Sequence, residues 1–149
     1  MTRAADLPRE ARAFLDAIAI GESGGADDDA AYSILFGGGH FDERWPSDFP
    51  QWAGKRVGNS MTHAAGRYQF EPATWAGLGG GNFAPENQDL MAWALATEVY
   101  VRRTGNHLLD MLTADDLDGI GDALTSTWTS VTSETFAARY RGCLAKLAA

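Results

Sequence analysis

Residues 8–22 of the chain are PREARAFLDAIAIGE, and this stretch decides the fold class. Its apolar residues, Phe14, Leu15 and Ile18 among them, recur at the spacing that places them on one face of an α-helix. Pro8 suits the first turn of a helix, and Gly21 lies near the expected end. The pattern therefore predicts an amphipathic helix over residues 8–21 whose apolar face packs on a core.

Glu22 has an unusual position at the end of this helix. It lies four residues after Ile18 and eight after Phe14, so one more helical turn would put its carboxyl group on or beside the apolar face. Desolvation and the negative end of the helix dipole both favour the protonated acid there. A carboxyl group that stays protonated near neutral pH can serve as a general acid. The alternative is a surface glutamate at a fraying helix end, and the residues alone leave both interpretations open.

The rest of the chain divides into a loop-rich part and a second helical part. Residues 23–81 are rich in Gly, Pro, Asn and Asp, which predicts turns, short helices and a small hairpin. Irregular stretches of this kind usually hold the binding groups of a domain, so we expect the functional site here. Helical spacing returns over residues 85–103, which predicts a central helix, and further helices are expected after Thr113 and after Ser133.

Composition favours one folded domain and excludes several classes of partner. The chain has 149 residues, 45% of them hydrophobic, which fits a single domain spanning residues 1–149. Twelve Lys and Arg against twenty Asp and Glu give a net charge of −8, which repels nucleic acid and anionic lipid. No segment approaches the roughly 18 apolar residues of a membrane span. We expect no nucleic-acid partner, no membrane insertion and a monomer.

Cysteine and histidine usage gives no sign of a metal site or cofactor. Cys143 is the only cysteine, and its spacing from Phe136 and Tyr140 indicates a buried thiol. The histidines lack the spacing of a zinc motif and are expected in loops and at helix ends; they are His40, His63 and His107. We therefore expect no metal and no cofactor.

Two further motifs have simpler interpretations than catalysis. Residues 21–25, GESGG, satisfy the G-x-S-x-G pattern of serine hydrolases. That pattern needs a strand before the serine and a helix after it, whereas here a predicted helix precedes Ser23 and a loop follows. The three aspartates at 27–29 lack the glycine and the distal glutamate of a calcium loop, so a solvated turn or a helix N-terminus is expected.

Residues 65–75, AGRYQFEPATW, form the second notable stretch. They supply an aromatic ring, a glutamine amide and a possible close backbone approach at Gly66, the groups that a sugar-binding cleft needs. The plainer interpretation is an ordinary hairpin or helix start.

Together these motifs resemble the bacteriophage lambda lysozyme family. Similar residues extend from Phe14 to Trp128, most of the chain. The most specific are a lone glutamate at a helix end, Glu22, and the stretch GRYQ at residues 66–69 downstream of it. Glu22 with the serine that follows it, together with residues 66–74, also resembles the broader lytic transglycosylase pattern.

The resemblance implies a lysozyme-like α+β fold, predominantly helical, with a small irregular or hairpin lobe beside a helical lobe. It implies cleavage of the β-1,4 bond between N-acetylmuramic acid and N-acetylglucosamine in peptidoglycan, with Glu22 as the catalytic acid. The residues expected to bind the glycan are Tyr32, Thr62, Arg67, Tyr68, Gln69 and Trp128. The loop from His40 to His63, which contains Trp45 and Trp52, differs from the family in residue types, so the family's sugar contacts are not carried over to it.

With one well-placed acid, the economical reaction is a lytic transglycosylation that yields a 1,6-anhydromuramoyl product. Two alternatives stay open. One is a hydrolysing muramidase that uses the same Glu22 with a positioned water or with a second carboxylate, such as Asp27, Asp42 or Glu43. The other is a catalytically inactive glycan-binding module.

The N-terminal residues, MTRAADLPRE, are polar and are not typical of a secretory signal. The expectation is therefore synthesis in the cytoplasm of a host bacterium and action on the cell wall after release. The resemblance implies a phage or prophage endolysin released through a separate membrane pore. Delivery by a virion or by a secretion system fits equally well.

Overall fold

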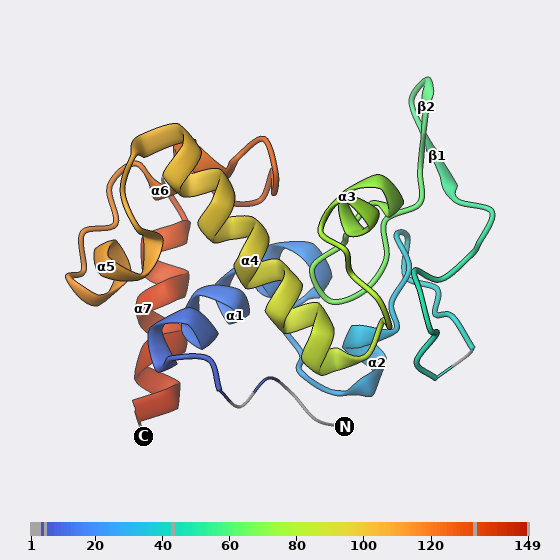
Figure 1. The fold of residues 1–149 in the computed structure, drawn as a ribbon, viewed down its shortest axis with the longest axis horizontal. Coiled ribbons are helices and arrows are strands. Elements are labelled where there is room, and N and C mark those ends of the chain that lie inside the picture. The colour runs from blue at the N-terminus through green and yellow to red at the C-terminus, as the bar shows by residue number, and fades with distance from the viewer. Residues whose placement is uncertain (1–3, 5, 43, 133, 149) are drawn as a thin grey trace.

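The computed structural model describes residue 4 and residues 6–42, 44–132 and 134–148 (Figure 1). In chain order, the elements are α1 (Arg9–Ser23), α2 (Asp29–Tyr32), β1 (Lys55–Val57), β2 (Ser60–Thr62), α3 (Pro72–Gly77), α4 (Pro85–Thr104), α5 (Leu108–Thr113), α6 (Ile120–Leu124) and α7 (Phe136–Ala148). The fold is α+β and predominantly helical, as expected. None of the helices in the described ranges is long and apolar enough to cross a membrane.

The helical lobe is built around α1. This helix packs along α7 and is crossed by α4, which runs diagonally through the molecule (Figure 1). Phe14 of α1 lies where the three helices meet, because its ring makes edge contacts with Trp93 of α4 and Phe136 of α7, both at 5.7 Å between centroids. The apolar face predicted from residues 8–21 therefore does pack on the core. It fixes the direction in which the end of α1 points.

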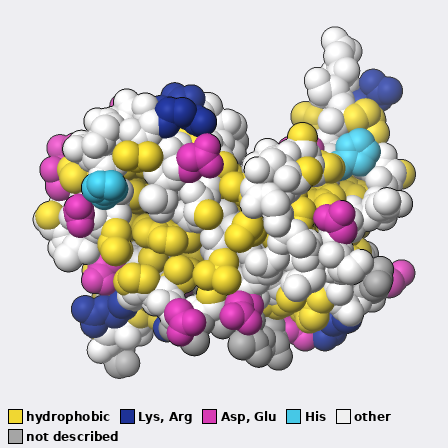
Figure 2. Space-filling model, viewed as in Figure 1, with side chains coloured by type: hydrophobic (Ala, Val, Ile, Leu, Met, Phe, Trp, Pro, Cys, Tyr) yellow, Lys and Arg dark blue, Asp and Glu magenta, His cyan; other side chains and the backbone are white. Residues whose placement is uncertain are grey.

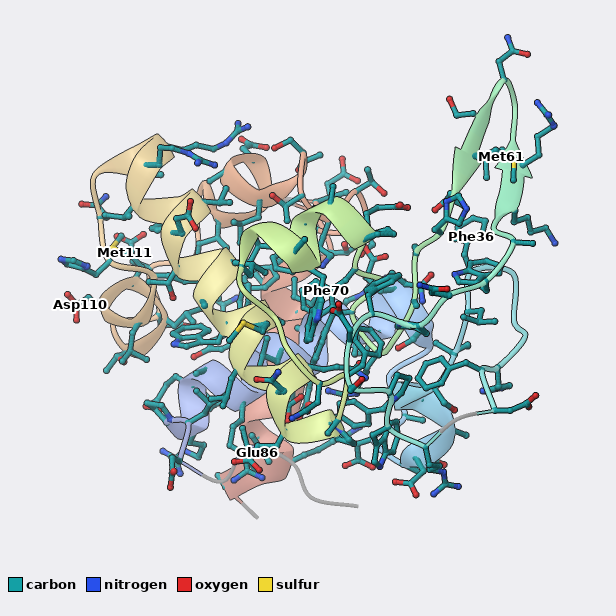
Figure 3. The ribbon with its side chains drawn as sticks, turned by 45° about the vertical axis from the view of Figure 1, so that its right-hand side comes forward. Phe36, Met61, Phe70, Glu86, Asp110 and Met111 are labelled. Carbon is teal, nitrogen blue, oxygen red and sulfur yellow. The ribbon has the colours of Figure 1, made fainter. Side chains whose placement is uncertain are left out.

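The second lobe is small and rests on an aromatic cluster. Rings of Phe70, Trp75 and Phe83 contact one another edge to face, with centroids 4.8–6.5 Å apart. Phe70 lies inside the molecule, whereas Met61 lies on the hairpin that projects from it (Figure 3). The two strands are antiparallel, with Arg56 opposite Met61, and confirm the predicted small hairpin.

Most helix boundaries follow the sequence pattern. α1 continues two residues beyond Gly21 and includes Glu22, and Gly24 ends it in the left-handed conformation with φ of 92°. α4 ends before Gly105, as predicted, and this glycine has a φ of 76°. Cys143 is buried, with 8% of its surface exposed, and Asp28 caps the N-terminus of α2 by accepting from the N–H of Ala31.

The helix expected after Thr113 is present as α6 (Ile120–Leu124), but it starts later than the pattern indicated. Thr113 is instead the last residue of α5, a short helix held by the buried side chains of Leu108 and Leu112, four residues apart. Asp115 follows with a φ of 57°, a left-handed conformation that interrupts the helical path, and α6 begins only at Ile120. For the last helix, α7 begins at Phe136, and Ser133 lies outside the described residues.

Candidate active site

Glu22 lies one residue before the end of α1, with its carboxyl group half-buried. Its Oε1 accepts a hydrogen bond of 3.1 Å from the Oγ hydroxyl of Ser130, which belongs to the loop between α6 and α7. Burial raises the pKa of Glu22, and hydrogen bonds from the side chain and backbone of Ser130 partly oppose that rise. Burial therefore favours the protonated form of the Glu22 carboxyl group, and the Ser130 hydroxyl can donate to the carboxylate that forms when the proton leaves.

A glycine brings the Ser130 loop onto the helix end. Gly21 has no side chain, and a Cβ atom there would overlap the Cβ and Oγ atoms of Ser130 and lie 3.2 Å from Nη1 of Arg139. The loop is also held from its other side, where Trp128 Nε1 donates to the carbonyl oxygen of Tyr68 at 3.0 Å. The Ser130 loop therefore lies directly against the end of α1.

Behind the helix end lies a buried polar network centred on Asp89. Its Oδ1 accepts hydrogen bonds from the hydroxyl groups of Tyr32, at 2.7 Å, and of Tyr68. The Tyr68 hydroxyl in turn accepts from Nη1 of Arg67 at 2.9 Å. Arg67 also donates to Asp16 of α1 at 3.0 Å and to the carbonyl oxygen of Ala26 at 2.7 Å. The network ties α1, α2, α4 and the turn that contains Arg67 into one unit.

That turn, at residues 66–69, needs a glycine and tolerates a strained glutamine. Gly66 has a φ of 85°, and a Cβ atom on it would lie 2.9 Å from the ring of Phe83. Gly66 is buried, so its close backbone approach is to Phe83 and Gln88 of the protein itself. Gln69 also has a positive φ, 53°, and its Nε2 donates to the carbonyl oxygen of Gly66 at 2.9 Å. The backbone N–H of Arg67 donates to Oε1 of Gln88, which anchors the turn on α4.

A hollow of about 320 Å³ lies between this turn and the α6–α7 loop. Gln69, Glu71 and Thr74 line it from one side, and Ser126, Thr127 and Trp128 line it from the other. The space-filling view shows the surface notched between the helical lobe and the projecting hairpin (Figure 2). Trp128, which lines the hollow, lies two residues before Ser130, which donates to Glu22, in the same loop.

Of the predicted glycan-binding residues, Gln69 and Trp128 line this hollow. Thr62 lies beside it, where its hydroxyl donates to the Glu71 carboxylate and so joins β2 to the start of α3. Direct sugar contact does not fit the other three, because they are almost fully buried; Tyr32, Arg67 and Tyr68 are 0%, 1% and 0% exposed.

Sequence reasoning missed three residues with evident roles in this arrangement. Ser130, 108 positions after Glu22, gave no signal because its partner is fixed only by the fold. Asp89 and Glu71 were not assigned roles, although an aspartate in the first turns of a largely apolar helix could have drawn attention to Asp89. Within the described residues there is no group of three or more His, Cys, Asp or Glu side chains placed to hold a metal ion.

Comparison with known protein families gives a match. A family model described as Endolysin matches residues 12–147 of the chain. The chain belongs to the endolysin family. It is a phage enzyme that degrades peptidoglycan. The resemblance to lambda-type lysozymes is thereby confirmed.

Solved structures of the bacteriophage lambda lysozyme have the same fold as this endolysin. One, complexed with a chitohexasaccharide, is 22% identical over 93% of this chain and 96% of that chain, with a TM-score of 0.74. Another is 23% identical over 97% of this chain and 95% of that chain, with a TM-score of 0.70. No curated protein matches the chain.

Proposed function

We propose that this endolysin is a lytic transglycosylase that cleaves the β-1,4 bond between N-acetylmuramic acid and N-acetylglucosamine, with Glu22 as its acid and base. The observation that supports this most is the environment of Glu22. Its carboxyl group is half-buried, its pKa is raised by that burial, and Ser130 donates to it. Among the described residues, no second carboxylate contributes to the raised pKa.

The proposed reaction starts with the protonated acid. Glu22 gives its proton to the glycosidic oxygen, the bond from that oxygen to C1 of the muramic acid breaks, and the N-acetylglucosamine leaves as an alcohol. The N-acetyl group of the substrate stabilises the positive charge that develops at C1. Ser130 stabilises the carboxylate that Glu22 has become.

The second half of the reaction restores the acid. The Glu22 carboxylate accepts the proton of the 6-hydroxyl group of the muramic acid, and the 6-oxygen bonds to C1. No water is consumed, and the product ends in a 1,6-anhydromuramoyl residue. A muramidase that uses the same Glu22 would instead need a second carboxylate at a set distance from the first, or a positioned water.

The glycan is proposed to occupy the hollow beside Gln69 and Trp128. The lambda lysozyme structure with a chitohexasaccharide supports a strand of N-acetyl sugars as the ligand. Tyr32, Arg67 and Tyr68 then act from beneath, as the buried unit that holds the 66–69 turn in place. We further propose that the chain folds as one domain, works as a monomer and meets its substrate in the cell wall after release from the host cytoplasm.

Mass spectrometry of digested sacculi tests the reaction type. Transglycosylation predicts fragments with 1,6-anhydromuramoyl ends, each lighter than the hydrolysis product by one water and resistant to borohydride reduction. Reducible, hydrated muramic acid ends as the main product would reject transglycosylation in favour of a muramidase. Sacculi that stay uncleaved by the folded protein would leave only a glycan-binding module.

A further inference from the structure

A second hollow lies in the small lobe, on the loop whose residue types depart from the family. It measures about 460 Å³, within the range of about 300–1,000 Å³ that is typical of small-molecule sites. Residues 48–52 form one wall, His63 follows β2, and Pro72 and Ala76 of α3 close the other side. Thr74 of the same helix lines the hollow beside Gln69, so α3 separates the two sites.

The aromatic residues of this second hollow are held rigidly. Trp52 Nε1 donates to the carbonyl oxygen of His63 at 3.0 Å, and the two rings meet edge to face with centroids 6.1 Å apart. Phe49 contacts the ring of Phe83 in the aromatic cluster at 5.1 Å. Trp52 and His63 are only half-buried. A fixed, partly exposed indole is a platform on which an apolar ring face can lie without a large loss of side-chain entropy.

Polar groups surround this platform. Asp48 and Gln51 are exposed at the rim, and Oδ1 of Asp48 accepts from the backbone N–H of Phe49 at 2.8 Å, which fixes the carboxylate. Asp48 and the His63 imidazole are the titratable groups of the described lining. The carboxylate disfavours an anionic ligand and readily accepts hydrogen bonds from hydroxyl groups. Aromatic faces with carboxylate, amide and imidazole groups therefore suit a neutral sugar with an acetamido group.

We propose that this hollow, lined by Asp48, Gln51, Trp52 and His63, is an accessory binding site for an N-acetylglucosamine residue of a glycan strand. N-acetylmuramic acid fits less well because its lactyl group brings negative charge towards Asp48, either as a free carboxylate or through the carboxylates of a peptide attached to it. The inference rests on the proposed function, since it presumes that glycan strands are the substrate. Two sites on one strand or on neighbouring strands would retain the enzyme on an insoluble wall through a high effective concentration.

The first test follows the indole N–H resonances of Trp52 and Trp128 by NMR while a chito-oligosaccharide is added. Trp52→Phe identifies the first resonance. The proposal predicts a saturable shift at Trp52, with its own dissociation constant. Asp48→Asn keeps the side-chain shape and the acceptor for Phe49 N–H, and it should weaken binding at Trp52 about fivefold without changing binding at Trp128.

Asp110→Asn is the matched control, because it removes the same charge from an exposed residue of α5 on the far side of the molecule (Figure 3). It should leave both dissociation constants unchanged. A Trp52 resonance that stays still while that of Trp128 moves would overturn the proposal, as would equal effects of Asp48→Asn and Asp110→Asn. Failure of the proposed function has a different signature, in which Trp128 does not respond or anhydro ends are missing, whatever happens at Trp52.

A second test uses the reaction. Gln51→Ala combined with Asp48→Asn should slow the initial cleavage of insoluble sacculi while the rate on short soluble glycan strands stays unchanged. Both side chains are exposed, so the fold should persist, and a thermal unfolding curve checks it. An equal loss on both substrates, or no loss on either, would contradict an accessory role.

Discussion

Glu22 and Ser130 form the contact on which the proposed chemistry depends. Burial favours the neutral acid, and the two donors of Ser130 favour the carboxylate, so the opposing effects hold a group that can both give and take a proton. A more deeply buried glutamate without a donor would not easily become a carboxylate. An exposed one would already be deprotonated at neutral pH.

Replacing Ser130 tests this balance through the pH dependence of cleavage. Ser130→Ala removes a hydrogen bond that stabilises the carboxylate, so the pKa of Glu22 should rise further above its ordinary value of 4.5. Since the first step needs the protonated acid, the high-pH limb of the activity profile should move to higher pH. Ser130→Thr, which keeps a hydroxyl group, should restore the original profile. A limb that stays in place or moves to lower pH would show that Ser130 does not tune Glu22.

Substitutions at the neighbouring residues Tyr68 and Gln69 should have different effects, the first mainly on stability and the second mainly on activity. Tyr68 is fully buried and hydrogen-bonded, so Tyr68→Ala should lower the free energy of unfolding by about 3–5 kcal/mol. Gln69 lines the hollow and is only partly buried, so Gln69→Ala should weaken cleavage while costing about 1 kcal/mol for its hydrogen bond. Urea unfolding and initial rates on sacculi measure both. The reverse pattern would place the Tyr68 ring at the substrate.

At this scale the sequence was informative where a local rule applied. Glu22 stood out because helical spacing alone sets it beside an apolar face. Arg67 and Tyr68 were assigned to the sugar because a motif does not reveal which side of a turn its side chains take. Their partners, Asp16 and Asp89, belong to helices far away in the chain.

Among the elements, α1 and the α6–α7 loop make the contact that assembles the site. Gly21 permits it, since any side chain there would occupy the place of Ser130. Alanine is a better helix former than glycine by about 0.5–1 kcal/mol, so helix propensity alone would favour Gly21→Ala. The glycine is therefore explained by the close approach of the loop and not by the helix.

Gly21→Ala should push the loop away from Glu22 and reduce cleavage without unfolding the protein. Gly142→Ala is the matched control, because Gly142 lies within α7 and a Cβ atom there would meet nothing within 4 Å. That variant should keep full activity and gain a little stability. The measurements are the initial cleavage rates and the unfolding midpoints of Gly21→Ala and Gly142→Ala. Equal activities would mean that the loop is free to shift and that its contact with α1 is unimportant.

The long helices could be predicted because their apolar spacing is sustained over several turns, as in α1 and α4. The short helix α5 could not be predicted, since a pattern of six residues is too short to distinguish a separate helix from the loop before the next one. The hairpin was expected only in general terms. Its strands have three residues each, all but Thr62 exposed, so no alternation of burial marks them.

At the scale of the whole molecule, the two lobes are joined by buried polar contacts as well as by apolar packing. Arg67 connects the 66–69 turn to α1 through Asp16 and, through Tyr68, to Asp89 of α4. Burying a charge is tolerated only when it is paired and hydrogen-bonded, as it is here. Such a network depends on distant segments meeting, which is why the sequence predicts the lobes but not how they are fastened together.

Both steps of the proposed reaction depend on Glu22 being the acid, and Glu22→Gln changes only that property. Below the ordinary pKa of 4.5 the glutamate is protonated in both the folded and the unfolded chain, so parent and variant should be almost equally stable. As the pH rises through the raised folded pKa, the parent must hold a poorly solvated carboxylate, and the variant does not. The stability of Glu22→Gln relative to the parent should therefore increase with pH. Thermal unfolding curves measure this difference, and they also show that the variant is folded.

The most direct measurement is the initial rate at which folded Glu22→Gln clears sacculi, relative to the parent. Loss of general acid catalysis is typically worth about 10² to 10⁴ in rate, so the account predicts a residual activity of roughly a hundredth or less. A folded variant that retains more than about a tenth of the parent rate, well above that range, would contradict the assignment of Glu22 as the catalytic acid.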